Sequence, residues 1–155
     1  MVRIRILDYE PRFREAFRDL NEWWIHRYFE MEEKDFQLLH DPKTHILDKG
    51  GLILIAQLEG HTAGVCALMP SEQSEFDFEL TKMGVAPEFH RRGVGMALGK
   101  AILKKAREMG ARRVFLESNT ILKPAIELYE KLGFREFLGE ASPYQRCNIQ
   151  MEIWL

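Results

Sequence analysis

The sequence has few cysteines and no long apolar run, and these absences exclude several classes of protein. Its two cysteines, Cys66 and Cys147, stand far apart in apolar surroundings without a CxxC pair. We therefore predict free, buried thiols in a reducing compartment rather than a disulfide. No stretch approaches the roughly 18 apolar residues of a membrane span, and the N-terminus shows no apolar signal core. We expect a cytoplasmic protein with no membrane partner.

The sequence also lacks an excess of charge of one sign, low-complexity segments and internal repeats. The 22 Lys and Arg residues nearly balance the 24 Asp and Glu residues, so the net charge of −2 gives no support for a nucleic-acid partner. The five histidines show no ligand spacing, so no metal site is predicted. With no linker rich in glycine, proline or serine, the 155 residues are predicted to form a single domain over residues 1–155.

Hydrophobic periodicity predicts an alternation of strands and helices. Residues 2–7 alternate apolar side chains with arginine, which is the period of a half-buried strand. Apolar residues follow at helical spacing from Phe13 to Tyr28, and a second short helix is predicted over residues 34–40. Residues 42–49 fit a short helix and a loop equally well.

The rest of the chain continues the alternation. Turn residues and periodicity predict strands over 52–58, 61–69, 76–85, 113–118, 134–138 and 148–154, and helices over 94–109 and 123–132. The two-residue break at 59–60 indicates a hairpin. The resulting order, β-α-α-β-β-β-α-β-α-β-β, indicates a mixed α/β (α+β) fold with helices on the faces of a central sheet.

The strongest chemical signal is a basic glycine loop that leads into the helix over 94–109. Gly93 and Gly95 lack a Cβ, so a phosphate can approach the backbone closely, and Arg91 and Arg92 add positive charge. The free N–H groups and the dipole at a helix N-terminus also favour an anion. We interpret this stretch as a pyrophosphate cradle.

Two segments carry a family resemblance. The segment VAPEFHRRGVGMAL resembles the acyl-CoA-binding motif of the GNAT superfamily of N-acetyltransferases, Gln/Arg-x-x-Gly-x-Gly/Ala, with His90 in the first position. The segment AIELYEKLGFRE over residues 125–136 resembles the family's C-terminal helix and strand. The resemblance implies the GNAT-like (acyl-CoA N-acyltransferase) fold, with a largely antiparallel sheet of about seven strands. It also implies acetyl-CoA as the acyl donor.

The resemblance further implies where the donor binds. The pantetheine arm would lie along the strand over 76–85 like an added strand, and the N–H of Met83 would polarise the thioester carbonyl. Asn119 would either cap a turn or reach the ligand. The residues predicted to bind the donor are Met83, Gly84, Val85, Arg91, Arg92, Gly93, Val94, Gly95, Met96 and Asn119.

Acetyl transfer needs a carboxylate that takes a proton from the attacking amine, and two glutamates qualify. Glu79 has the strand parity of Met83, so both would face one cleft if no bulge intervenes. Glu117 is the competitor, at the position where some family members carry their glutamate. For either glutamate the alternative is a charged strand residue paired with Lys82 or Arg113.

Further residues complete the predicted site. Tyr129 matches the family's tyrosine that protonates the leaving thiolate, and its alternative is a core tyrosine. Trp23 and His26 fall off the core stripe of the first helix and are predicted to contact the acceptor. The acidic residues between positions 30 and 35 suit a cationic amine, with a solvated acidic face as the alternative.

The predicted function is therefore acetyl transfer from acetyl-CoA to an unidentified primary amine, by direct attack in a ternary complex. A homodimer is compatible with the sequence. One rival is a non-catalytic acyl-CoA-binding or regulatory domain of the same family. The other is a nucleotide-binding domain outside it, against which the absence of a GxxxxGK[ST] loop argues.

Overall fold

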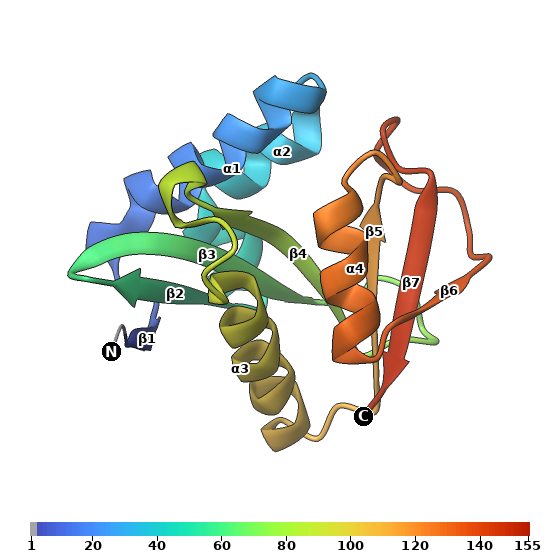
Figure 1. Cartoon of the computed structure of the whole chain (residues 1–155). Coiled ribbons are helices and arrows are strands. Elements are labelled where there is room, and N and C mark those ends of the chain that lie inside the picture. The colour runs from blue at the N-terminus through green and yellow to red at the C-terminus, as the bar shows by residue number, and fades with distance from the viewer. Residues whose placement is uncertain (1–2) are drawn as a thin grey trace.

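The computed structural model describes residues 3–155 and contains a seven-stranded sheet with helices on both faces (Figure 1). Position 2 of the predicted first strand lies outside the described residues. In chain order the elements are β1 (Ile4–Asp8), α1 (Arg14–Tyr28), α2 (Glu33–His40), β2 (Leu52–Leu58), β3 (His61–Pro70), β4 (Phe78–Val85), α3 (Val94–Glu108), β5 (Arg113–Ser118), α4 (Lys123–Leu132), β6 (Arg135–Phe137) and β7 (Ile149–Trp154). The predicted order of strands and helices is confirmed.

Short helical turns fill three connections. Two are 3₁₀ turns, over Pro11–Phe13 and Pro87–Phe89, and the ambiguous segment at 42–49 contains a π-helical turn over Lys43–Leu47. The predicted hairpin at 59–60 is present between β2 and β3, where Glu59 and Gly60 have left-handed φ values of 54° and 79°. Two consecutive residues of this kind match the twist of the strands they join.

The strands follow the order β1-β2-β3-β4-β5-β7-β6 and are antiparallel except for β4 and β5. In the described chain, β4 and β5 pair at two positions, Phe78 with Val114 and Glu79 with Phe115. Beyond Glu79 the two strands separate. The sheet therefore has an internal opening between β4 and β5, visible in Figure 1 where the green and orange strands diverge.

Each face of the sheet is covered by its own pair of helices. Cys66 and Leu68 of β3 belong to the hydrophobic core shared with α3, to which α4 also adds side chains. Val65 and Ala67, their neighbours in the same strand, belong to the core shared with α1 and α2. Because both faces of the central strands are buried, β2 and β3 read as nearly continuous apolar runs.

A β-bulge in β4 changes which face each of its residues occupies. Val65 pairs with Gly84 and Ala67 pairs with Thr81, so two residues of β4, Lys82 and Met83, stand opposite one residue of β3. Lys82 has a left-handed φ of 54° at this point. The parity between Glu79 and Met83 that the sequence predicts for an unbulged strand is therefore wrong.

The two residues lie on opposite faces of the sheet instead. Glu79 pairs with Met69, whose side chain belongs to the core beside α1 and α2. Met83 packs against the core beside α3 and α4. A molecule that reaches both residues must therefore pass through the opening between β4 and β5.

Among residues 3–155, no helix is both long and apolar enough to cross a membrane.

Candidate active site

A cavity of about 700 Å³ occupies the opening between β4 and β5. It is lined from both faces of the sheet, by α1 on one side and by α3 and α4 on the other. The predicted site residues that line it are Trp23, Glu79, Met83, Gly84, Val85, Arg91, Gly93, Val94, Gly95, Met96, Glu117, Asn119 and Tyr129. Two predicted residues, His26 and Arg92, do not line the cavity.

The edge of β4 beside the cavity offers backbone groups that β5 does not use. Met83 and Val85 lie beyond the last pair with β5 and line the cavity. The Val85 carbonyl oxygen is 2.9 Å from Nε2 of His90, and a carbonyl can only accept, so Nε2 donates. The histidine that replaces Gln or Arg in the motif therefore covers one acceptor of this edge.

The glycine loop leads into α3 at the place where the sequence predicts a pyrophosphate cradle. The first intrahelical hydrogen bond runs from the N–H of Ala97 to the Gly93 carbonyl, so the N–H groups of residues 94–96 remain available to an anion. Gly93 has a left-handed φ of 82°. A Cβ on Gly95 would lie 2.9 Å from Cδ2 of Leu128 in α4, so glycine allows α3 and α4 to approach each other here.

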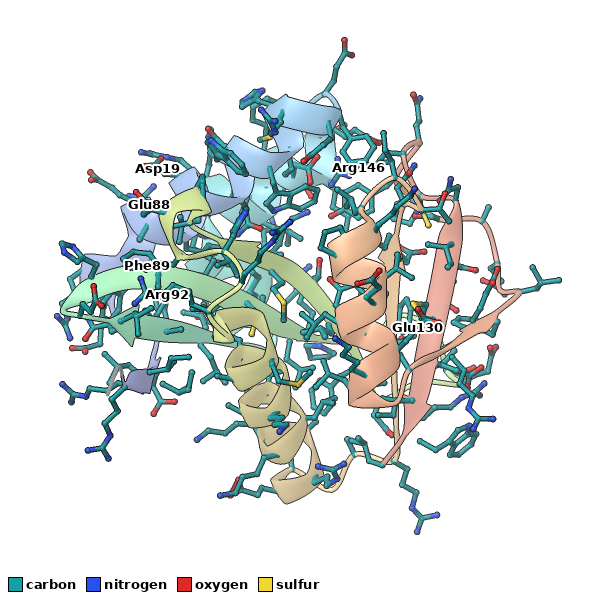
Figure 2. All side chains as sticks on the ribbon, viewed as in Figure 1. Asp19, Glu88, Phe89, Arg92, Glu130 and Arg146 are labelled. Carbon is teal, nitrogen blue, oxygen red and sulfur yellow. The ribbon has the colours of Figure 1, made fainter. Side chains whose placement is uncertain are left out.

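Arg92, which was predicted to meet the donor phosphates, is occupied elsewhere. Its Nη2 lies 2.8 Å from Oε1 of Glu59 in the β2–β3 turn, and its guanidinium stacks near the ring of Phe89. In Figure 2 it lies beside the green strands, away from α4. The partner is 33 positions away, so no local pattern identified it. Arg91 lines the cavity and is the better-placed cation.

Glu79 has the environment of a general base. Its carboxylate is partly buried and accepts no hydrogen bond from any other side chain in the described chain. Burial raises its pKa to about 7, with Lys34 opposing this shift and Glu117 adding to it. A carboxylate with a pKa near neutral can take a proton and release it again. Lys82 and Arg113, its predicted alternative partners, pair with Asp35 and Glu152 instead.

Glu117 shares the face of Glu79 but has a partner. Glu79 pairs with Phe115 of the parallel strand β5, and paired residues of neighbouring strands lie on the same face. Glu117 is two residues after Phe115 and therefore lies on that face as well. One Glu117 oxygen accepts a hydrogen bond of 2.9 Å from Nε2 of Gln150. That bond occupies one of the two carboxylate oxygens, whereas both oxygens of Glu79 are free of side-chain donors in the described chain. The environment therefore favours Glu79 over Glu117 as the base.

Tyr129 lines the cavity from α4 and also packs on the core. Its ring meets the ring of Phe134 edge-on, with centroids 6.0 Å apart. Burial raises the pKa of Tyr129 to about 12, so the phenol keeps its proton at neutral pH. Tyr129 can therefore be both a proton donor and a core residue, because its ring packs against Phe134 while the residue also borders the cavity.

With this geometry in place, the chain can be compared with known proteins. The family model described as the acetyltransferase (GNAT) family matches residues 12–134. This chain belongs to the GNAT acetyltransferase family. An uncharacterized N-acetyltransferase of Escherichia coli, YjgM, is 40% identical over 100 residues, which are 63% of this chain and 60% of that protein. The chain spans about half the length of the curated relatives it matches, with 60%, 48% and 43% covered in three of them.

Solved structures agree on the fold. An acetyltransferase of the GNAT family from Staphylococcus aureus Mu50 superposes with a TM-score of 0.85 at 18% identity, covering 98% of this chain and 99% of that one. A protein from Salmonella typhimurium, solved with its cofactor acetyl-CoA, superposes with a TM-score of 0.74 at 14% identity, covering 98% and 94%. The predicted GNAT-like fold is confirmed, and acetyl-CoA is the donor that GNAT acetyltransferases use.

The cradle of this GNAT chain can be tested with two glycines in the same conformation. Gly93 and Gly110, at the two ends of α3, have left-handed φ values of 82° and 86°, and a Cβ on either would meet no close neighbour. Alanine at each should cost about 1 kcal/mol of stability through the same backbone strain. We expect Gly93→Ala alone to weaken acetyl-CoA binding, by about tenfold in Kd by calorimetry, because the cradle N–H groups move. Equal Kd values for both variants would contradict the cradle.

Helix α1 borders the cavity of this GNAT chain, but only one of the two α1 residues predicted to contact the acceptor lines it. Trp23 lies at the mouth, 39% exposed, with its ring centroid 5.9 Å from that of His90. Trp24 and Tyr28 also line the cavity. His26 sits two residues from each of them and therefore on the opposite side of the helix, where it is exposed. The acceptor contact predicted for His26 is not supported.

Sequence reasoning missed a buried ionic cluster at this end of the cavity, which we call the Asp35 cluster: Asp35, Lys82, Tyr144 and Arg146. Lys82 Nζ lies 2.6 Å from Asp35 Oδ1 and 3.0 Å from Tyr144 Oη. Arg146 donates from both Nη atoms to the two Asp35 oxygens, each at 2.6 Å. Figure 2 shows Arg146 between the blue helices and α4.

The cluster shifts the pKa values of its members in opposite directions. Burial alone would raise the pKa of Asp35, but the hydrogen bonds from Arg146 and Lys82 outweigh it and lower the pKa to about 2. Burial lowers the pKa of Lys82 to about 8, against the pull of Asp35. The cluster also fixes the bulge, because the ion pair anchors the side chain of the residue that has the left-handed backbone.

Two sequence signals pointed toward this cluster. Glu32 and Asp35 have the spacing of a capping box, and in the structure each accepts a backbone N–H at the start of α2. Lys82 is also the one lysine within the apolar strand over 76–85. Neither interpretation of the acidic stretch, a surface for a cationic amine or a solvated face, describes Asp35, which is fully buried and paired with Lys82 and Arg146.

Other expectations can be placed as well. Cys66 and Cys147 are free, and Cys66 is buried as predicted, whereas Cys147 is partly buried and lines the cavity. The Asn119 side-chain nitrogen donates a hydrogen bond of 2.7 Å to the Arg146 carbonyl. Its oxygen accepts from the N–H of Ile121 and so caps a turn, which means that both ends of the amide already bind protein groups. Within residues 3–155, no three His, Cys, Asp or Glu side chains are grouped to hold a metal ion.

Proposed function

We propose that this chain transfers an acetyl group from acetyl-CoA to a primary amine by direct attack in a ternary complex. The observation that carries the proposal is the single cavity that joins the β4 edge at Met83, on one face, to the Glu79 carboxylate on the other. The donor would enter from the face of α3 and α4, and the amine from the face of α1 and α2. The opening between β4 and β5 lets them meet.

The residues would act in sequence. The edge of β4 at Met83 and Val85 would hold the pantetheine amides as an added strand does, with the Val85 carbonyl shared with His90. The N–H groups of residues 94–96 would hold the pyrophosphate. The Met83 N–H would stabilise negative charge that develops on the thioester oxygen. Arg91 would contribute charge beside the phosphates.

Proton transfers then balance the reaction. Glu79 takes one proton from the bound ammonium and so frees the lone pair that attacks the thioester. As the new N–C bond forms and the C–S bond breaks, the nitrogen releases its second proton to solvent. Tyr129 gives its proton to the departing thiolate, so that free CoA leaves as a thiol. Solvent returns the proton to Tyr129 and accepts the proton from Glu79, which restores both groups for the next turnover.

An amine panel tests the proposal through release of free CoA. Release with at least one primary amine is expected. If no amine releases CoA although acetyl-CoA binds, the chain is a non-catalytic acyl-CoA-binding or regulatory domain. If acetyl-CoA does not bind at all, the donor assignment itself fails.

Tyr129→Phe is expected to lower kcat by about 10–10² with little change in acetyl-CoA affinity, because only the proton donor is lost. Stopped-flow or steady-state CoA release measures kcat, and calorimetry measures affinity. The matched control is Tyr9→Phe, which removes the same hydroxyl from a tyrosine that packs beside α1 and does not line the cavity. An unchanged kcat in Tyr129→Phe would return this residue to a packing role.

A further inference from the structure

The Asp35 cluster presents hydrogen-bond donors to the cavity and keeps its carboxylate behind them. Lys82, Tyr144 and Arg146 line the cavity. Asp35 is fully buried and does not line it, and Glu32, which lies 3.5 Å from Arg146, does not line it either. An acceptor in the cavity therefore meets the cations and the phenol first.

Several of these donors are unused. The Lys82 ammonium has no lone pair, so Tyr144 Oη must accept from it, and the phenol hydrogen stays free. One of the three Lys82 N–H groups also has no partner in the described chain. Arg146 directs one N–H from each Nη to Asp35, and its Nε–H makes no hydrogen bond with residues 3–155.

The donors are held rigidly. The Arg146 guanidinium lies 4.5 Å from the ring centroid of Tyr144 and 5.6 Å from that of Trp24, so aromatic faces enclose it. The Arg146 side chain is 12% exposed and Lys82 is 5% exposed. Fixed, desolvated donors of this kind bind an anion more strongly than mobile surface lysines do.

Carboxylates border the same cavity from the sheet. Glu79 and Glu117 lie on the face of α1 and α2, next to the donors of the cluster. The site therefore offers acceptors for an ammonium group and donors for an acid group. The two cations of the cluster are balanced by Asp35 and Glu32, so the donors suit a singly charged carboxylate better than a phosphate dianion.

We propose that the acceptor of this enzyme is an amino acid, or another amine that carries a carboxylate, bound with its amine at Glu79 and its carboxylate against Tyr144, Lys82 and Arg146. The proposal rests on the proposed acetyl transfer and names the class of its acceptor. The exposed aromatic rings of Trp23 and Tyr28 at the mouth leave the side chain of the acceptor in apolar surroundings.

Matched acceptors test the carboxylate. Each set contains an amino acid, its carboxamide and its decarboxylated amine, for example phenylalanine, phenylalaninamide and phenethylamine, with parallel sets for leucine and glutamate. CoA release should give the amino acid a kcat/KM about tenfold or more above its carboxamide. The carboxamide has the less basic and so more available amine at neutral pH, which means that amine reactivity alone would give the opposite order.

A variant assigns the preference to the cluster. Tyr144→Phe should lose most of the ratio between acid and carboxamide, through a higher KM for the acid, while Tyr9→Phe keeps the ratio. Without any variant, phenylpropanoate, which has the carboxylate but no amine, should compete with the acceptor in the wild-type protein, and phenylpropanol should not.

The outcomes are distinct. Equal kcat/KM values within each set, or a preference for the decarboxylated amines, would overturn the carboxylate site and leave acetyl transfer standing. No CoA release from any member of any set, or from the wider amine panel, would overturn acetyl transfer itself. If the ratio of kcat/KM between amino acid and carboxamide is unchanged in Tyr144→Phe, the carboxylate of the acceptor does not bind at this cluster.

Discussion

Replacing Glu79 with glutamine should lower kcat/KM for an amine at neutral pH by about 10²–10³, because the amide cannot accept a proton from the bound ammonium. The matched control is Glu117→Gln, the same change on the neighbouring strand at a carboxylate already bonded to Gln150. We expect that control to lose less than about tenfold. The reverse ranking would make Glu117 the base.

The pH profile gives an independent readout of the same group. Burial raises the pKa of Glu79 to about 7. Wild-type kcat/KM should rise with pH until Glu79 is ionised and then stay level up to the pKa of the acceptor amine. In Glu79→Gln the level region should disappear, because only amine that is already neutral can react. A bend near pH 7 in both proteins would exclude Glu79 as its source.

The same substitution should stabilise the fold. The pKa of Glu79 is about 7 when folded and 4.5 in its unperturbed state, so the folded protein binds more protons between these values. Its stabilising contribution is complete below pH 4.5 and is lost as the pH rises through 7. At a pH above 7, Glu79→Gln should gain about 1–3 kcal/mol in free energy of unfolding, measured with urea, and the gain should vanish near pH 4.

Asp35→Asn should destabilise the protein by about 3–5 kcal/mol, because Lys82 and Arg146 would remain buried without their shared carboxylate. Urea unfolding measures the loss. The matched control is Asp19→Asn, which breaks a pair with Arg18 that is exposed to solvent and 2.9 Å long. That change should cost less than about 0.5 kcal/mol. Adding Lys82→Met to Asp35→Asn should recover part of the loss, since one unpaired charge is removed.

Acid should act on the same carboxylate. The folded pKa of Asp35 is about 2, below the unperturbed 3.8, so the stability it contributes is complete above 3.8 and is lost as the pH falls toward 2. The difference in stability between wild type and Asp35→Asn should shrink over this range. A difference of the same size down to pH 2 would mean that the ion pairs contribute little.

The glycine loop and the tyrosine helix on one side of the cavity could be located from the sequence because their signals are local. The glycines at 93 and 95 and the tyrosine at 129 sit in short motifs whose chemistry depends on neighbours within a few residues. Periodicity located the strands and helices for the same reason. The turn conformation at Glu59 and Gly60 also follows from two adjacent residues.

The Asp35 cluster was not predictable because its contacts are distant in sequence. Asp35 meets Lys82 across 47 positions and Arg146 across 111, and no periodic pattern records such pairs. The sequence predicted that Glu79 and Met83 share a face, because they are four residues apart in one strand. The bulge at Lys82 places them on opposite faces instead. One extra residue in a strand leaves no mark in composition, yet it moves every later side chain to the other face.

The opening between β4 and β5 is an edge placed inside the molecule. At the outer rim of a sheet, unpaired strands invite any extended chain, which is how aggregation begins. Here the unpaired part of β4 is walled by Leu128 and Tyr129 of α4 and by Trp23 of α1, so a folded neighbour cannot reach it. An extended, flexible molecule can lie along such an edge as an added strand does. An unpaired strand edge that would promote aggregation at the rim of a sheet therefore lines an internal cavity in this fold.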